Sequence, residues 1–216
     1  MNIVSVKSGA DGDQRRIELS DGSLLSFKIC YLPPVFLDEG FYTPGVADGR
    51  EINADEEEAF RFASACLRAE KAALQLITRA EQNVFGLTIK LEKRGHNPPC
   101  IHAVIAQLYA LGLVDDRRYA RLWLESRISR QAASPRLLLA ALRSRSINRH
   151  DAEAVLKDVL DPETEQQLLE RYVQKMQRKH AASGDGSDAA SFRSLRYALK
   201  NEGFSSGAIE WFLDNA

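Results

Sequence analysis

Arginine, the side chain best suited to hold a carboxylate or a phosphate, is concentrated in one segment of this chain. Its guanidinium group presents N–H donors in a planar fork that matches both anions. Between residues 117 and 150 there are nine arginines and one acidic residue, Glu125. The nine are Arg117, Arg118, Arg121, Arg127, Arg130, Arg136, Arg143, Arg145 and Arg149. The segment therefore predicts a surface that contacts phosphates or an acidic protein.

These arginines are spread around their helices and do not form one stripe. On a helical projection the first three share one side, whereas Arg127 and Arg130 project from nearly the opposite side. Three interpretations stay open. One is a solvated surface in which Arg121 pairs with Glu125, four residues later. The second is a site for DNA phosphates, and the third is a site for an acidic protein surface.

Sequence-specific reading of DNA bases is not expected from this segment. Only two aromatic residues, Tyr119 and Trp123, lie among the arginines. Base stacking needs exposed aromatic platforms, and positions in a helical core account for both residues better.

No group of residues points to catalysis or to a bound cofactor. The three cysteines, Cys30, Cys66 and Cys100, lack paired spacing, and the four histidines lie far apart. We find no nucleophile–base set and no phosphate loop. The sequence also lacks a membrane-length apolar run and a signal-peptide pattern. We expect a reduced cytoplasmic protein that is not an enzyme, with no metal, no cofactor and no membrane contact.

The N-terminal residues predict a small sheet followed by an irregular, acidic connector. Apolar and β-branched residues at 3–6, 16–19 and 24–29 predict two or three strands, and Asp21-Gly22 predicts a hairpin turn. Residues 31–53 are rich in proline and glycine, which favours irregular structure. Asn53 can then cap a helix that continues, whole or with a break, to about Arg79.

The rest of the chain repeats one pattern three times. In each copy, two leucines and a small residue stand four apart: Leu87, Leu91 and Gly95; Leu138, Leu142 and Ser146; Leu195, Leu199 and Gly203. Nine and ten residues after each small residue comes an apolar pair: Val104-Ile105, Val155-Leu156 and Phe212-Leu213. The leucines lie on one helical face, and the small residue suits a helix end. Each copy therefore predicts three short helices.

Helix start signals support the same register. Asn83 and Ser134 each stand four residues before the first leucine of a copy, where they can act as N-caps. Pro135, Asn97-Pro98 and Asp161-Pro162 place proline at the first helical position, which tolerates its missing N–H.

We therefore expect a mainly α protein of three tandem three-helix repeats in an elongated array, with a small N-terminal β extension. The expected parts are residues 1–53 (β-hairpin and connector), 54–114 (first repeat with a preceding helix), 115–160 (second, arginine-rich repeat) and 161–216 (third repeat, with a glycine- and serine-rich loop at 180–188). One compact bundle with chance self-similarity is the alternative.

The segment from 112 to 120 has a glycine, two apolar residues, two aspartates, two variable residues, an aromatic and a small residue. Its defining positions are Gly112, Asp115, Asp116, Tyr119 and Ala120. This pattern resembles the signature of the RecX family. The leucines of the first two repeats resemble that family's repeats as well, and the N-terminal hairpin resembles an extension that some members carry.

The chain departs from the family pattern at four places. Gly86 and Ala141 stand at or near positions where the family usually has glutamate, and Ser134 and Ser146 stand where it usually has glycine. The repeat spacing is unaffected. Asp115 is expected to cap the helix that begins at Asp116, and both carboxylates lie near the positive end of that helix. Catalysis is not expected from them, since no partner base or metal ligand accompanies them.

The resemblance implies a regulator of the RecA recombinase. Family members lie in the groove of the RecA–DNA filament, where they meet both RecA and single- or double-stranded DNA without sequence preference. It implies a monomer that modulates, in the inhibitory direction, recombinase, ATPase and co-protease activities in DNA repair and the SOS response. The alternative is a stand-alone, non-specific DNA-binding helical module.

Overall fold

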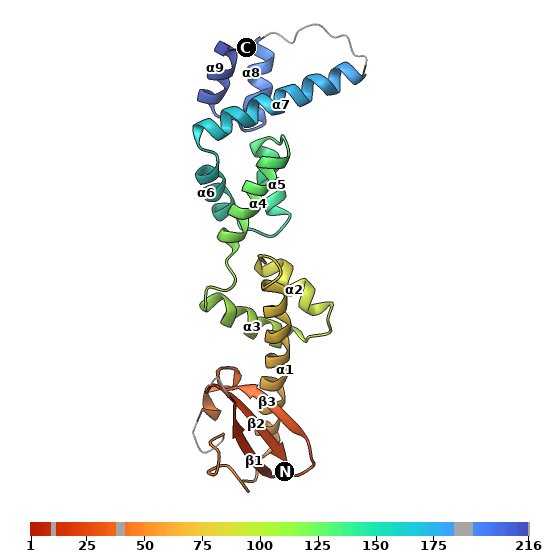
Figure 1. Cartoon of the computed structure of the whole chain (residues 1–216), viewed down its shortest axis with the longest axis vertical. Coiled ribbons are helices and arrows are strands. Elements are labelled where there is room, and N and C mark those ends of the chain that lie inside the picture. Colours follow the sequence, from red (N-terminus) through yellow and green to blue (C-terminus); the bar gives the residue numbers. More distant parts are fainter. Residues whose placement is uncertain (10–11, 38–41, 184–191, 216) are drawn as a thin grey trace. The chain divides into compact units, whose positions relative to one another are not determined.

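The chain is mainly helical, with one small sheet at its N-terminal end (Figure 1). The computed structural model describes residues 1–9, 12–37, 42–183 and 192–215, of which 180–183 and 192–193 are described for the backbone only. It forms two compact units, Met1–Val114 and Asp115–Ala216. Each unit has its own apolar core. The predicted fold class, mainly α with a β extension, is confirmed.

The first unit begins with a three-stranded antiparallel sheet. Strands β1 (Ile3–Ser8), β2 (Gln14–Leu19) and β3 (Leu24–Lys28) lie in the order β1-β2-β3. Side chains alternate between the two faces of a strand, and the buried face carries residues such as Val6, Ile17 and Leu25, which pair across the sheet. The three-stranded alternative is thus the correct one.

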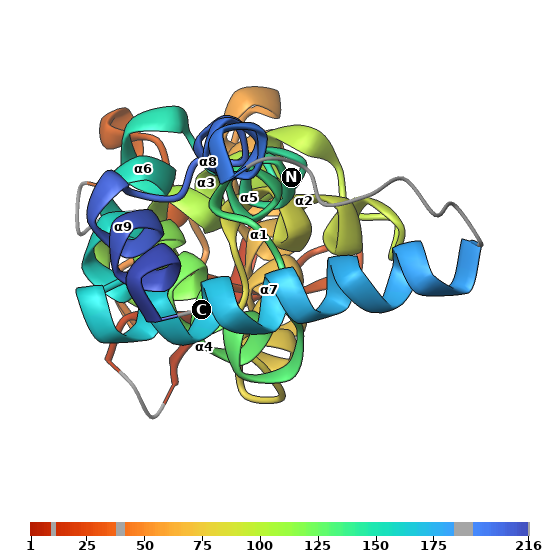
Figure 2. The same cartoon turned by 90° about the horizontal axis from the view of Figure 1, so that it is seen from above.

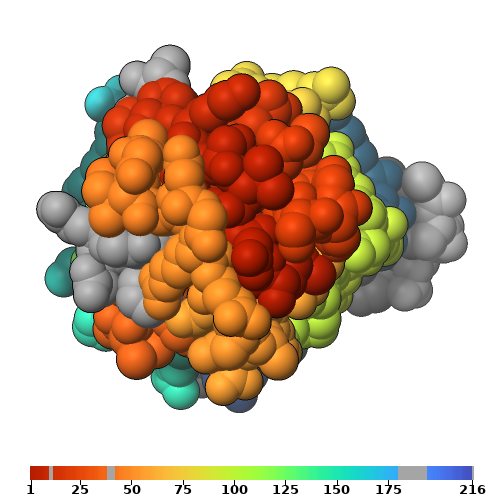
Figure 3. All heavy atoms as spheres, turned by 90° about the horizontal axis from the view of Figure 1, so that it is seen from below, coloured from red at the N-terminus to blue at the C-terminus, as the bar shows by residue number. Residues whose placement is uncertain are grey.

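The connector after β3 returns to the edge of the sheet. It contains two short 3-10 turns, Ile29–Tyr31 and Pro34–Phe36, and is otherwise irregular where it is described. The backbone N–H of Ile3 donates to the Arg50 carbonyl (2.9 Å), and that of Gly49 donates to the Ile3 carbonyl (2.8 Å). Figure 3 shows this end of the unit, where the segment leading into the first helix (orange) lies beside the strands (red).

Three helices complete the first unit: α1 (Ala54–Ile77), α2 (Val84–Glu92) and α3 (Pro98–Ala110). Helix α1 is unbroken and is capped by Asn53, whose side chain accepts from the Glu56 backbone N–H (2.9 Å). A small sheet is marginal by itself, and here it packs on α1, where the rings of Phe27 and Phe60 lie 5.3 Å apart.

Six helices form the described part of the second unit: α4 (Asp116–Arg130), α5 (Pro135–Arg143), α6 (Arg149–Val159), α7 (Pro162–Ser183), α8 (Phe192–Asn201) and α9 (Ser206–Asn215). The C-terminal part of α7 extends past α8 and α9 (Figures 1 and 2). Helix α7 includes residues 180–183, so the predicted glycine- and serine-rich loop is wrong for these four residues. The rest of that segment, 184–188, lies outside the described residues.

The helix boundaries follow the signals found in the sequence. Asn83 and Ser134 cap α2 and α5 as predicted. The small residues Gly95, Ser146 and Gly203 follow the ends of α2, α5 and α8 with φ of +81°, +60° and +90°. These angles fall in the left-handed region, which glycine adopts without strain and which other residues adopt at a cost. Ser146 is the one non-glycine residue with positive φ among those described.

An ion pair ties α4 to α6 in the second unit. The guanidinium of Arg117 donates to Asp151, which also accepts from the Asn148 side chain. Partial burial acts to raise the pKa of Asp151, but the hydrogen bonds from Arg117 and Asn148 outweigh it and hold that pKa below its usual value. The charged carboxylate therefore stabilises the folded unit.

We expect Ser146→Gly to stabilise the second unit, because it relieves a left-handed conformation that costs about 1–2 kcal/mol for a residue with a Cβ. The greater freedom of glycine in the unfolded chain offsets part of this gain, which leaves about 0.5–1 kcal/mol. Urea unfolding followed by tryptophan fluorescence reports on this unit, since both tryptophans, Trp123 and Trp211, lie in it. The matched change Gly203→Ser should act in the opposite direction. Equal effects of the two changes would contradict this account.

We expect Asp151→Asn to lower the free energy of unfolding by about 1 kcal/mol near pH 7. Because the pKa of Asp151 is lower in the folded state, its contribution is complete above the unfolded-state pKa of about 3.9 and is lost as the pH falls through the folded-state value. The parent and the variant should therefore converge in acid. A difference in stability that is constant from neutral pH into acid would exclude this role for the carboxylate.

Candidate nucleic-acid interface

The nine predicted arginines all lie in the second unit. Arg117, Arg118, Arg121, Arg127 and Arg130 are on α4, Arg136 and Arg143 on α5, Arg145 in the turn after it, and Arg149 at the start of α6. Arg145 is half-buried and the others are exposed. The arginines differ in how much positive charge they leave available to a partner molecule, because some of them pair with carboxylates.

Ion pairs inside the unit hold several of the arginines. Besides Arg117 with Asp151, these are Arg121 with Asp158 (3.1 Å), Arg136 with Glu202 (3.8 Å), and Arg143 and Arg149 with Glu153 (3.6 and 2.7 Å). The predicted pairing of Arg121 with Glu125 is wrong, because α6 packs on α4 and brings Asp158 to the guanidinium. Exposed pairs such as these add little to stability. They do offset much of the positive charge that the sequence suggests.

The opposite side of α4 keeps its charge. A guanidinium from Arg145 lies 4.4 Å from the centre of the Trp123 ring, and that of Arg127 lies 5.9 Å from it. A ring face attracts a cation without neutralising it. No carboxylate pairs with Arg127 or Arg130 in the part of the chain that the structure describes. We call Trp123, Arg127, Arg130 and Arg145 the Trp123 surface.

A small hollow lies on the Trp123 surface. It has a volume of about 160 Å³ and is lined by Trp123, Ser126, Arg127, Arg130 and Gln131. Both Tyr119 and Trp123 are half-buried and pack against the core, as the sequence predicts, but Trp123 also positions guanidinium groups. The hollow therefore offers two exposed guanidinium groups, a hydroxyl and an amide, which are the groups that contact phosphates.

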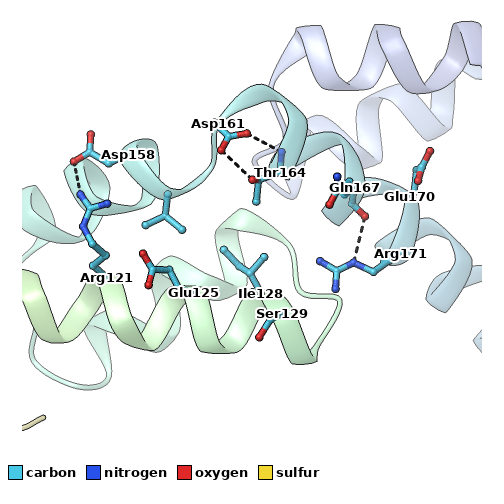
Figure 4. Close-up of a pocket in the computed structure, with 11 residues that line it drawn as sticks. Arg121, Glu125, Ile128, Ser129, Asp158, Asp161, Thr164, Gln167, Glu170 and Arg171 are labelled. Carbon is cyan, nitrogen blue, oxygen red and sulfur yellow. Dashed lines mark hydrogen bonds and ion pairs between the residues drawn. The ribbon is translucent and has the colours of Figure 1, made fainter.

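A larger groove lies on the other side of α4, between it and the residues from the end of α6 into α7 (Figure 4). Its volume is about 720 Å³. Four carboxylates and two guanidinium groups line it: Glu125, Asp158, Asp161, Glu170, Arg121 and Arg171. Asp161 caps α7 by accepting from the Thr164 backbone N–H (2.8 Å). An excess of carboxylates repels phosphates, so a polyanion would bind the Trp123 surface in preference to this groove.

The residues of the signature segment build the junction between α3 and α4. Gly112 has a φ of +67° in the turn after α3. Asp115 caps α4 by accepting from the backbone N–H groups of Arg117 (2.8 Å) and Arg118 (3.1 Å), which confirms the capping interpretation. Asp116 is the first residue of α4, Tyr119 packs against the core and Ala120 is fully buried. Within the second unit, the cap at Asp115 and the packing of Tyr119 and Ala120 position the arginines of α4.

The described residues give no support for a metal site or for a membrane-spanning helix. Within them, no three or more histidine, cysteine, aspartate or glutamate side chains gather in a way that could hold a metal ion. The cysteines Cys30, Cys66 and Cys100 are free thiols. No helix in the same residues is long and apolar enough to cross a membrane.

Comparison with known proteins gives one consistent result. Residues 115–156 match the family model described as the second three-helix domain of RecX. A regulatory protein RecX of Treponema pallidum is 34% identical over 131 residues, which cover 61% of this chain and 80% of that protein. Another, from Mycobacterium leprae, is 33% identical over 156 residues, covering 72% of this chain and 84% of that protein.

Solved structures agree with the fold. A crystal structure of regulatory protein RecX covers 99% of this chain and 98% of its own, with a TM-score of 0.68 and 18% sequence identity. RecX from Lactobacillus salivarius covers 71% of this chain and 97% of its own, with a TM-score of 0.54 and 19% identity. The sequence relatives carry the assignment: this chain belongs to the RecX family of regulatory proteins.

Proposed function

We propose that this protein binds RecA–DNA filaments in their helical groove and modulates RecA, in the inhibitory direction, through contact and not through catalysis. Occupation of the groove would obstruct strand exchange and co-protease access, and a change in filament growth would lower ATP hydrolysis. The proposal includes a cytoplasmic monomer that needs no cofactor. Membership of the RecX family is the observation that carries it.

The Trp123 surface is the proposed DNA contact within the second unit. Its support is the difference between the two sides of α4, where Arg121 is paired with a carboxylate and Arg127 and Arg130 are not. Guanidinium groups without carboxylate partners can exchange condensed counter-ions of DNA for protein contacts, which gives salt-sensitive binding without sequence preference. The paired arginines would contribute less, since a phosphate must compete with the carboxylate that each already has.

We further propose that residues 54–114, 115–160 and 161–216 act as three repeats, each offering surface to the filament. The match of residues 115–156 to a family model for one three-helix domain supports this division. A filament offers many identical sites at a regular spacing, and repeated units of one chain suit such a partner.

We expect the protein, at several-fold molar excess over RecA, to lower ATP hydrolysis by RecA on single-stranded DNA. The double variant Arg127→Ala/Arg130→Ala should require about tenfold more protein for the same effect, which corresponds to about 1.4 kcal/mol of binding free energy. The assay measures phosphate release at fixed DNA and RecA concentrations.

The matched control is Arg143→Ala/Arg149→Ala, which removes the same charge from arginines that pair with Glu153. It should shift the half-maximal concentration by no more than about twofold. Unchanged ATP hydrolysis with the parent protein would sink the RecA proposal. DNA binding in that case would favour the stand-alone DNA-binding module. If the two double variants lost inhibition of ATP hydrolysis equally, pairing with carboxylates would not determine which arginines contact the DNA.

A further inference from the structure

A second group of cations gathers in the first unit, away from the arginine-rich segment. Arg68 and Lys71 lie on the exposed side of α1, and Lys93, Arg94 and His96 lie at the turn from α2 to α3. We call these five residues the basic cluster.

Contacts between the turn and α1 bring the cluster together. The Nη1 atom of Arg94 donates to the carbonyl of Ala72 (3.1 Å), which is one helical turn from Arg68. Arg68 and Lys71 share that side of α1, since residues three and four apart are neighbours on a helix. Arg68 in turn donates to the hydroxyl of Ser64 (3.3 Å). Each of these two arginines makes one such hydrogen bond to the described residues, so most of its five N–H donors stay available.

The cations of the basic cluster are not neutralised by acidic neighbours. Among the residues that the structure describes, no carboxylate pairs with any of the five. Partial burial lowers the pKa of His96, and the charges of Arg68 and Arg94 lower it further. Gathering like charges costs free energy, and a bound polyanion would offset that cost.

Arg61 provides the contrast on the same helix. It lies seven residues before Arg68 and is also exposed, but it pairs with Glu57 (2.7 Å) and approaches Asp21 (3.8 Å). Of the two exposed arginines on α1, Arg61 therefore has carboxylate partners, and Arg68 has none among the described residues.

We propose that the basic cluster binds the phosphate backbone of DNA, through Arg68 and Arg94 above all. This goes beyond the proposed function, because it assigns a DNA contact to the first unit and does not require RecA. An acidic protein is the less suitable occupant. Protein interfaces are built around exposed apolar and aromatic anchors, and α1 exposes no large apolar side chain. Phosphate contacts need exposed cations alone.

The test is binding of the full-length protein to a fluorescently labelled single-stranded DNA without RecA, measured by anisotropy over a series of salt concentrations. Each phosphate contact on a single strand contributes about 0.7 to the slope of log affinity against log salt. The double variant Arg68→Gln/Arg94→Gln should therefore lower the slope by about 1.4 and weaken binding about tenfold near 0.1 M salt. Each single variant should show about half of the change in slope.

The matched control is Arg61→Gln, which removes one exposed charge from the same helix and should leave the slope unchanged. Circular dichroism melts of all variants check that the surface substitutions leave the fold intact. Parent-like affinity and slope in the double variant would overturn the proposal, as would undetectable DNA binding by the parent at low salt. Normal binding to DNA alone, with lost binding to RecA filaments, would also overturn it, in favour of an acidic protein partner. Failure of the RecA proposal would appear in the ATPase assay and leave this measurement unaffected.

Discussion

The short helices of this protein depend on how their ends are satisfied. A helix of nine or ten residues, such as α2, α5 or α8, is marginal alone, because few of its backbone groups find partners within it. Asn83 and Ser134 supply the first missing bonds, and left-handed residues at the other ends turn the chain back. Each of these helices then buries one leucine-bearing face in the core of its own unit. Capping and burial together define where each functional side chain can point.

This constraint explains why so much of the fold could be predicted. Capping residues, proline at the first helical position and leucines four apart act locally, so the sequence alone located the ends of most helices. The strands followed from alternation and one tight turn. The unbroken course of α1 could not be decided in this way, because a helix that packs on both the sheet and other helices has no single apolar stripe.

The candidate site was less predictable, because ion pairing depends on tertiary structure. Arg117 and Arg121 meet carboxylates that lie 34 and 37 residues further along the chain, so no local pattern shows that they are paired. The number of arginines in the sequence indicates the second unit as a whole. The structure distinguishes Arg127 and Arg130 from the paired arginines, because no carboxylate of the described residues pairs with them. The basic cluster was missed for the opposite reason. Its members are divided between α1 and a turn some twenty residues later, and no local pattern shows that these two segments lie together.

The two proposed DNA contacts share one property, which is that each contains guanidinium groups without a carboxylate partner among the described residues. These groups belong to Arg127 and Arg130 on the Trp123 surface and to Arg68 and Arg94 in the basic cluster. Natural surfaces usually mix both signs, and the groove beside α4 does so, with carboxylates in excess. Against this background, Arg127 lies over the aromatic ring of Trp123, and Arg94 in the basic cluster donates to a backbone carbonyl, so both of these partners are neutral. Neutral anchors orient a guanidinium group and preserve its charge. A carboxylate would orient it equally well but would compete with a phosphate. The choice of anchor therefore separates arginines that stabilise the fold from arginines that can recognise a polyanion.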